Sequence, residues 1–173
     1  TRSDGRTTVD VFPVSMWDRL LLNGYRAEVW LSDGKLLSDT GSLNSVDAPA
    51  GVSLVLGAGN VVSITALDIL NRLYESGHVV IAKMNPVNAY MRPHLEAIFA
   101  DYCGAGFVQF VDGGAEAGAF LTHHDGVDDV HLTGSAATHD AIVWGSGVDA
   151  GDRKSRGTPL LKKPITSELG GVS

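Results

Sequence analysis

Residues 52–60 read VSLVLGAGN, an apolar run that gives way at once to the turn Gly57-Ala58-Gly59-Asn60. Two later stretches follow the same pattern, Val80-Ile81-Ala82-Lys83 and Leu132-Thr133-Gly134-Ser135. In an open parallel sheet, the residues that bind ligand follow the carboxyl ends of the strands. The three stretches therefore predict a nucleotide-binding layer.

Apolar strands and helical segments alternate from residue 52 onward, which indicates a parallel sheet with right-handed crossovers. We expect strands at 52–56, 79–82, 107–111, 127–132 and 164–169. We expect helices from an N-cap at Asn60 to a stop at Gly77, and at 88–103, 115–122 and 136–144. The fold class is α/β, a Rossmann-like doubly wound parallel sheet.

Residues 52–173 form this domain, which we expect to be truncated at its C-terminus, and residues 1–51 form an irregular extension that packs on the core. Within that extension we expect a strand at 27–31 and a loop at 36–51, and we expect a second loop at 145–161.

Composition excludes several classes of function. The chain has 173 residues and a formal charge of −7, and it is 44% hydrophobic. Such an acidic chain is a poor match for nucleic acid, which is bound through clustered Lys and Arg. The single cysteine, Cys103, excludes an intrachain disulfide and a cysteine-based metal site. No apolar run spans a membrane and no signal peptide is evident, so we expect a cytoplasmic protein with no membrane partner.

Several side chains at these strand ends suit the chemistry of a nucleotide site. Gly57, Ala58 and Gly59 begin like a dinucleotide fingerprint, although Val62 replaces the third glycine and the acidic ribose ligand about twenty residues later is absent. Lys83 ends that later strand instead, and its ammonium suits ribose hydroxyls or phosphate. The alternatives are a tight turn for the glycines and a snorkelling side chain for Lys83.

Four further positions have both a functional and a structural interpretation. Gly114 and Gly118 would let a pyrophosphate approach the start of a helix, and the Ser135 hydroxyl would lie at the first turn of another. The Asn60 amide suits a developing oxyanion, or it simply caps a helix. Glu168, beside glycines at a sheet end, suits a general base, or it is a surface acid.

The histidine-rich stretch does not predict a metal site. Its ligand-type residues are spaced unlike any common zinc motif, so we expect no metal. These residues are His123, His124, Asp125, His131, His139 and Asp140.

Taken together, these motifs resemble the cofactor-binding domain of the aldehyde dehydrogenase superfamily, over about residues 52–173. Asn60 matches the asparagine of the family's Pro-Trp-Asn motif, and Lys83 lies at the family's spacing from it. Residues 114–135 are similar to its Gly-x-x-x-Gly…His-x-x-Val-Asp…Phe-Thr-Gly-Ser run, without a gap. Ser167-Glu168-Leu169-Gly170-Gly171 is similar to its Leu-Glu-Leu-Gly-Gly segment.

The resemblance implies specific roles. Asn60 would stabilise the oxyanion and Glu168 would act as the general base. The residues implied in binding NAD or NADP are Gly57, Ala58, Gly59, Lys83, Asn85, Pro86, Gly114, Gly118, Thr133, Gly134 and Ser135.

The chain also departs from the family. Ala58-Gly59 replaces Pro-Trp, Met84-Asn85-Pro86 replaces the usual Pro, small residue and Glu or Ser, and His139 replaces a glycine. The family's nucleophilic cysteine normally lies some thirty residues beyond Glu-Leu-Gly-Gly, and Cys103 does not match it.

We therefore expect the cofactor-binding part of an NAD(P)-dependent aldehyde oxidoreductase that is inactive alone. Its substrate would be a small-molecule aldehyde, and the full protein a homo-oligomer. Two alternatives stay open. One is a non-catalytic binding or assembly module with the same fold, and the other is a reductase that forms acyl-CoA.

Overall fold

The computed structural model describes residues 7–31 and 50–170. The chain divides into two compact units, Thr1–Ser45 and Val46–Ser173. In the smaller unit, β1 (Thr8–Phe12) and β2 (Ala27–Trp30) form an antiparallel pair, and the segment that connects them contains α1 (Met16–Leu21). The loop expected at 36–51 lies almost entirely outside the described residues. How the extension packs on the core stays a prediction.

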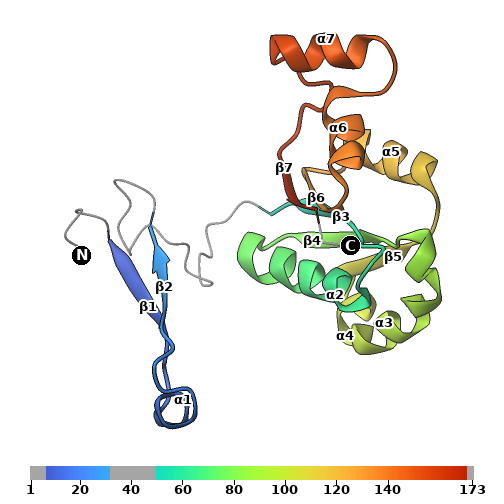
Figure 1. Cartoon of the computed structure of the whole chain (residues 1–173). Coiled ribbons are helices and arrows are strands. Elements are labelled where there is room, and N and C mark those ends of the chain that lie inside the picture. Colours follow the sequence, from blue (N-terminus) through green and yellow to red (C-terminus); the bar gives the residue numbers. More distant parts are fainter. Residues whose placement is uncertain (1–6, 32–49, 171–173) are drawn as a thin grey trace. The chain divides into compact units, whose positions relative to one another are not determined.

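The larger unit is a five-stranded parallel sheet with helices on both faces (Figure 1). Its strands are β3 (Val52–Leu56), β4 (Val79–Lys83), β5 (Val108–Val111), β6 (Asp129–Gly134) and β7 (Ile165–Leu169). Its α-helices are α2 (Val62–Asn71), α3 (Arg92–Ile98), α4 (Ala100–Gly104), α5 (Ala115–His123), α6 (Ala136–Trp144) and α7 (Asp149–Arg156). A π-helix (Arg72–Ser76) extends α2, and a 3-10 helix (Pro86–Met91) precedes α3.

The strand order β5-β4-β3-β6-β7 confirms the doubly wound fold. The chain runs outward from β3 through β4 to β5, and then crosses back to β6 on the other side of β3. Every neighbouring pair of these strands is parallel. The order therefore reverses between β3 and β6, and in open α/β sheets the ligand crevice lies at such a reversal.

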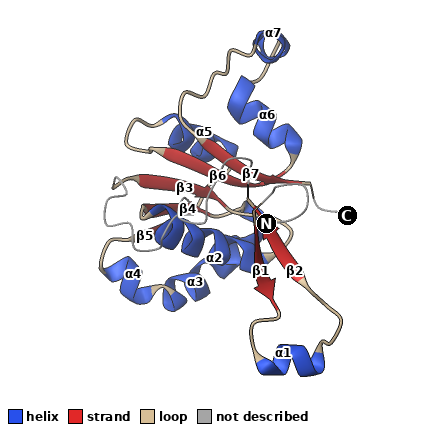
Figure 2. Cartoon of the chain, turned by 90° about the vertical axis from the view of Figure 1, so that its left-hand side faces the viewer, coloured by secondary structure: helices blue, strands red, loops and turns tan. Residues whose placement is uncertain are grey.

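Two apolar cores fix the helices to the sheet. Helices α2, α3 and α4 cover one face and α5 and α6 cover the other, as Figure 2 shows. On the first face, Val55, Ile69 and Phe99 belong to a buried cluster that also includes residues of β4 and β5. On the second face, Leu54, Val130 and Leu132 belong to another. Adjacent residues of β3 thus pack into the cores on opposite faces of the sheet, because successive side chains of a strand point to opposite faces.

Three expected elements differ in the structure. Asn60 does not cap α2: the N-cap is Val61, and the Asn60 Oδ1 atom accepts instead from the Val61 N–H at 3.0 Å. The helix expected at 88–103 is broken into three short helices, one of which carries Pro93 in its first turn. The strand expected at 127–132 begins two residues later, at Asp129.

The loop expected at 145–161 contains a helix, α7, which has no buried residue. Its sequence is marked by a charge pattern instead of apolar periodicity. Asp149 and Asp152 lie in its first turn and pair with Arg153 and Arg156 one turn later, at 3.8 and 3.2 Å. Gly157 ends the helix in the left-handed conformation. None of the described helices is long and apolar enough to cross a membrane.

Candidate functional site

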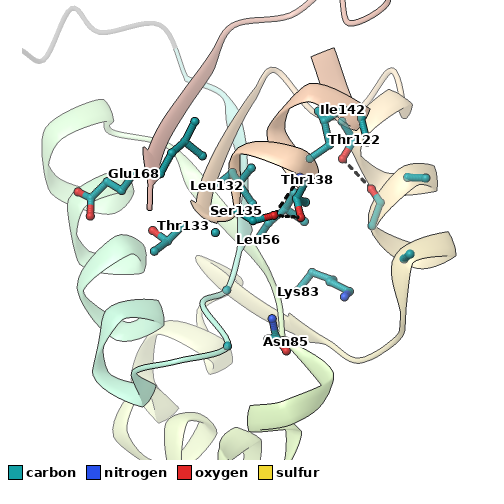
Figure 3. A pocket seen from close by; sticks show the side chains of 18 of the residues that line it. Leu56, Lys83, Asn85, Thr122, Leu132, Thr133, Ser135, Thr138, Ile142 and Glu168 are labelled. Atoms are coloured by element: carbon teal, nitrogen blue, oxygen red, sulfur yellow. Dashed lines mark hydrogen bonds between the residues drawn. The ribbon is translucent and has the colours of Figure 1, made fainter. Parts of the chain in front are cut away.

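A cavity of about 1070 Å³ lies at the carboxyl edge of the sheet (Figure 3). Its walls are the ends of β3, β4, β6 and β7 and parts of α5 and α6. All the predicted site residues except Ala58 and Pro86 line it. The predicted residues in its lining are Gly57, Gly59, Asn60, Lys83, Asn85, Gly114, Gly118, Thr133, Gly134, Ser135 and Glu168.

The turn after β3 is held tightly against the end of β4. The Gly57 N–H donates to the Lys83 carbonyl at 3.0 Å, and the Asn88 amide donates to the Ala58 carbonyl at 2.9 Å. Ala58 is 1% exposed, so its part in the site is to anchor the turn. Pro86 is exposed and begins the 3-10 helix, whose N-cap is the side chain of Asn85.

We predict that Gly57→Ala destabilises the fold. A Cβ atom there would lie 2.7 Å from the Oγ1 atom of buried Thr65 and 3.3 Å from the Lys83 carbonyl oxygen. Overpacking of this kind costs about 1–3 kcal/mol, to be measured by urea unfolding. Gly151→Ala in α7 is the matched control, since nothing lies within 4 Å of its added methyl group. Equal stability of the two variants would contradict the prediction.

Lys83 brings a charge into the cavity from the end of β4. Its side chain is 7% exposed, and within residues 7–31 and 50–170 no hydrogen bond or ion pair reaches its ammonium. Burial lowers the pKa of Lys83 from its ordinary value, and the nearby charge of Asp112 opposes this shift. The side chain reaches the cavity, where its ammonium is available to an anionic or hydroxylated ligand.

Asn60 lies at the mouth of the cavity, after β3. Its Oδ1 atom is engaged by the Val61 N–H, while its Nδ2 atom has no partner among the residues that the structure describes. Asn60 is exposed and lines the cavity. The free amide N–H groups are therefore available to an oxygen atom of a ligand, which is the property that an oxyanion donor requires.

Two helix N-termini face the same cavity. Gly114 is the N-cap of α5 and makes no side-chain cap, so the first N–H groups of this helix are left to a ligand. Ser135 is the N-cap of α6, where its Oγ atom accepts from the Thr138 N–H at 3.1 Å and lies 2.9 Å from the Thr138 hydroxyl. Helix N-termini bind phosphate through such N–H groups and the helix dipole.

Glu168 lies on β7, in a wall that the cavity shares with a second, smaller one of about 500 Å³. Figure 3 shows its carboxylate turned toward α2, on the far side of the cavity from Lys83. The side chain is exposed. The general-base role of Glu168 stays a prediction, as do the ligand roles of the other lining residues.

A polar network lies between the α2 region and strands β6 and β7, where most of its residues line the smaller cavity. Thr133 donates to Asp68 at 3.1 Å, and Asp68 lies 3.3 Å from His131. His131 in turn contacts Arg72 and Thr166, at 3.1 and 2.8 Å. His131 is thus engaged in structural contacts. No three His, Cys, Asp or Glu side chains in the described parts of the chain are placed to hold a metal ion.

Cys103 lies away from the cavity, near the end of α4. It is half-buried and packs against the apolar cluster under β4 and β5. Burial and the neighbouring charge of Glu96 both raise the pKa of its thiol. Nucleophilic cysteines require the opposite shift, so this environment is that of a structural thiol.

Sequence reasoning missed several lining residues. Thr138 could have been predicted from the sequence, because a hydroxyl side chain three residues after an N-cap residue such as Ser135 lies within hydrogen-bonding reach of it. Ile64, Thr122 and Ile142 have no such signal: they become lining residues only because three helices converge on the cavity.

The chain matches the family model described as "Aldehyde dehydrogenase family" over residues 27–173. It resembles an aldehyde dehydrogenase of Mycobacterium tuberculosis complexed with NAD+, at 25% identity and a TM-score of 0.52 over 72% of this chain and 23% of that one. Two further structures show the same fold. One is GapN, a glyceraldehyde-3-phosphate dehydrogenase of Methanocaldococcus jannaschii complexed with NADP, at 17% identity and a TM-score of 0.53 over 71% of this chain and 25% of that one. The other is a mutant of proline utilization A from Bradyrhizobium japonicum, at 21% identity and a TM-score of 0.56 over 70% of this chain and 12% of that one.

The chain thus spans a quarter or less of the length of these three proteins. No curated protein sequence matches it. The family match covers most of the chain and includes the whole five-stranded sheet. The chain belongs to the aldehyde dehydrogenase family.

Proposed function

We propose that this chain is the cofactor-binding part of an NAD(P)-dependent aldehyde oxidoreductase, and that it supplies an oxyanion donor and a general base to a cysteine located elsewhere in a longer protein. The observation that carries the proposal is the larger cavity, at the strand-order reversal. It collects an ammonium that has no partner among the described residues, two helix N-termini, a free amide and a carboxylate.

The residues present fit a nicotinamide dinucleotide. Lys83 offers its ammonium to a ribose or its phosphate, and Asn85 lies beside it. The N-termini of α5 and α6 suit the two charges of a diphosphate. The cavity volume, about 1070 Å³, is slightly above the range of about 300–1,000 Å³ typical of ligand pockets.

The chemistry follows from these placements. When bound, NAD(P)+ supplies the hydride acceptor for aldehyde oxidation. The Asn60 amide donates hydrogen bonds to the oxygen atom of the aldehyde, where negative charge develops during attack by a thiolate. Glu168 accepts a proton from the water that releases the acid product. Cys103 has no part in this scheme, because its thiol is half-buried with a raised pKa.

We expect Lys83→Ala to weaken the binding of NAD(P) to this chain. The loss of a charged hydrogen bond costs about 1–3 kcal/mol, and no other Lys or Arg is found among the described residues of the lining. Titration calorimetry with NAD+ and NADP+ measures the effect. Lys162→Ala is the control, because Lys162 is exposed and its ammonium contacts only the Pro159 carbonyl among the residues described.

Unchanged affinity of Lys83→Ala for both cofactors would remove Lys83 from the site. Failure of the unmodified chain to bind either cofactor, while circular dichroism shows it folded, would overturn the proposed function itself.

A further inference from the structure

Strand β7 carries Glu168 at the edge of the sheet, and apolar packing holds this strand only at its start. It pairs with β6 alone, because no described strand lies on its other side. Its first residue, Ile165, packs against an apolar core, and the four residues after it are exposed. The register of a strand is strongly specified where one of its faces is buried, and a slip of one residue turns every side chain to the opposite face. Burial therefore specifies the register of β7 only weakly.

Side-chain hydrogen bonds hold β7 from the α2 side instead. Thr166 lies opposite His131 of β6, and Glu168 lies opposite Thr133. The Oγ1 atom of Thr166 is 2.7 Å from the Nη2 atom of Arg72 and 2.8 Å from the Nδ1 atom of His131. Arg72 begins the π-helix that extends α2, so its guanidinium links this helix to the edge strand. Arg72, His131 and Thr166 are called the β7 clamp below.

The direction of each hydrogen bond in the β7 clamp follows from Arg72, which can only donate. Its Nη2 group donates to the Thr166 oxygen, so the Thr166 hydroxyl can donate its own proton to His131. The Nδ1 atom of His131, which is also 3.1 Å from Nη2 of Arg72, is therefore an acceptor. This leaves the ring proton on Nε2, which faces the Asp68 carboxylate at 3.3 Å. Thr166 thus acts both as an acceptor and as a donor, two roles that a serine can fill and a valine cannot.

The β7 clamp is largely buried and continues to a residue of the larger cavity. Asp68 and His131 are 7% and 6% exposed, and Asp68 also accepts from the Thr133 hydroxyl at 3.1 Å. Buried hydrogen bonds are costly to break, because water does not readily replace the lost partner. Among the described residues, the Arg72 Nε atom is the one buried side-chain nitrogen or oxygen without a partner. The guanidinium is therefore oriented to bind through its Nη groups while its Nε atom stays unpaired.

We infer that the β7 clamp fixes the register of β7 and thereby positions Glu168, with Arg72, His131 and Thr166 as positioning residues. Glu168 follows Thr166 by two positions, so both side chains leave the strand on the same face. Figure 3 shows the Glu168 carboxylate turned toward α2, the side from which Arg72 reaches Thr166. Glu168 is also the one described residue that lines both cavities, so the face on which it lies decides what its carboxylate can reach. This inference rests on the proposed general-base role and adds the residues that hold the base in place.

Amide hydrogen exchange, followed by NMR on this chain, tests the β7 clamp without any turnover. Thr166→Val removes the hydroxyl and nearly keeps the side-chain shape. We expect the β7 amides that bond to β6 to exchange about 5- to 30-fold faster, the scale of one lost hydrogen bond to a charged group, while exchange in β4 is unchanged. Thr158→Val is the matched control and should leave β7 unchanged, because Thr158 is exposed and its hydroxyl has no partner among the described residues.

Thr166→Ser separates the hydroxyl from strand propensity. Serine keeps the hydroxyl, so the β7 amides should keep their slow exchange. Valine favours strands more than serine does, so propensity alone predicts the opposite order of the two variants.

The same variants test the positioning of Glu168 in a longer protein that contains this chain and supplies a cysteine. Thr166→Val should keep the burst of reduced cofactor and slow the later attack of water by about 10- to 100-fold, the scale of a misplaced catalytic group. Thr166→Ser should restore the rate, and Thr158→Val should not change it. A general loss of folded protein would reduce the burst as well, so the ratio of the two phases identifies a positioning effect.

The outcomes separate this inference from the proposed function. Unprotected β7 amides in the unmodified chain, or exchange in Thr166→Val that is no faster, overturn the β7 clamp. Exchange that is equally fast in Thr166→Ser and Thr166→Val assigns the effect to packing and overturns it as well. Faster exchange in Thr166→Val with an unchanged rate of water attack overturns the positioning of Glu168. If Glu168→Gln itself leaves that rate unchanged, the proposed general-base role fails, and the exchange measurement still decides whether the clamp exists.

Discussion

Asp129→Ala is expected to lower the free energy of unfolding by about 3–5 kcal/mol, the typical cost of removing one partner from a buried ion pair. The Asp129 carboxylate accepts from the Ser53 hydroxyl at 2.9 Å and lies 2.7 Å from the His78 ring nitrogen. The Arg72 guanidinium is 3.9 Å away. The side chains of Arg72, His78 and Asp129 are only 13%, 16% and 15% exposed, so solvent would not readily replace the lost partner.

The measurement is urea unfolding of the unmodified chain and the variant. Asp125→Ala is the control: Asp125 is an exposed acid after α5 with no partner among the described residues. It should change stability by less than about 0.5 kcal/mol, as surface substitutions usually do. A loss in Asp129→Ala no larger than in the control would show that the network around Arg72 contributes little. Asp129→Asn, which keeps the shape and one acceptor, should be intermediate.

This network also shows where sequence reasoning stops. Residues Asp129, His131 and Thr133 alternate with Val130 and Leu132 along β6, so one face of the strand is polar and the other apolar. The alternation predicts a strand, but it does not say that a helix covers the polar face. Asp68 and Arg72 from the α2 region meet that face only through the packing of residues about sixty positions apart.

The parallel sheet could be predicted from the sequence for a clear physical reason. Strands such as β3 and β4 are buried on both faces and read as short apolar runs, and glycines or a polar side chain mark where each run ends. The strand ends carry the candidate site, so most of its residues could be named in advance. The order of the strands explains why residues as distant as Lys83 and Glu168 face one cavity, and no local pattern contains that order.

The elements that the sequence predicted wrongly, α7 and the start of α2, also differ for local reasons. α7 has no apolar stripe, and its charged side chains form two exposed ion pairs between adjacent turns, a pattern that hydropathy does not register. Asn60 is a residue type that favours N-caps, yet its carbonyl-type oxygen binds the next N–H and the helix begins one position later. That one-residue shift leaves the Asn60 amide nitrogen without a partner among the described residues, which favours the proposed oxyanion role.

The second large effect concerns turnover. This chain is expected to oxidise no aldehyde with either NAD+ or NADP+, because its single thiol is in an environment that disfavours the thiolate. Cys103→Ser should leave the null result unchanged and should bind cofactor normally. Turnover in the unmodified chain that disappears in Cys103→Ser would show that Cys103 is the nucleophile after all.

In a longer protein that contains this chain and supplies a cysteine, Glu168→Gln is expected to lower kcat by about 10²–10⁴-fold, the usual contribution of a general base. Asn60→Ala should lower kcat by about 10²–10³-fold, as loss of one oxyanion donor does.

A rapid-quench experiment separates the roles of Glu168 and Asn60. Glu168→Gln should still release one equivalent of reduced cofactor per active site in a burst, because only the later attack of water needs the base. Asn60→Ala should slow the burst itself, because the oxyanion forms when the thiolate attacks. A burst abolished by Glu168→Gln and unaffected by Asn60→Ala would reverse the two assignments.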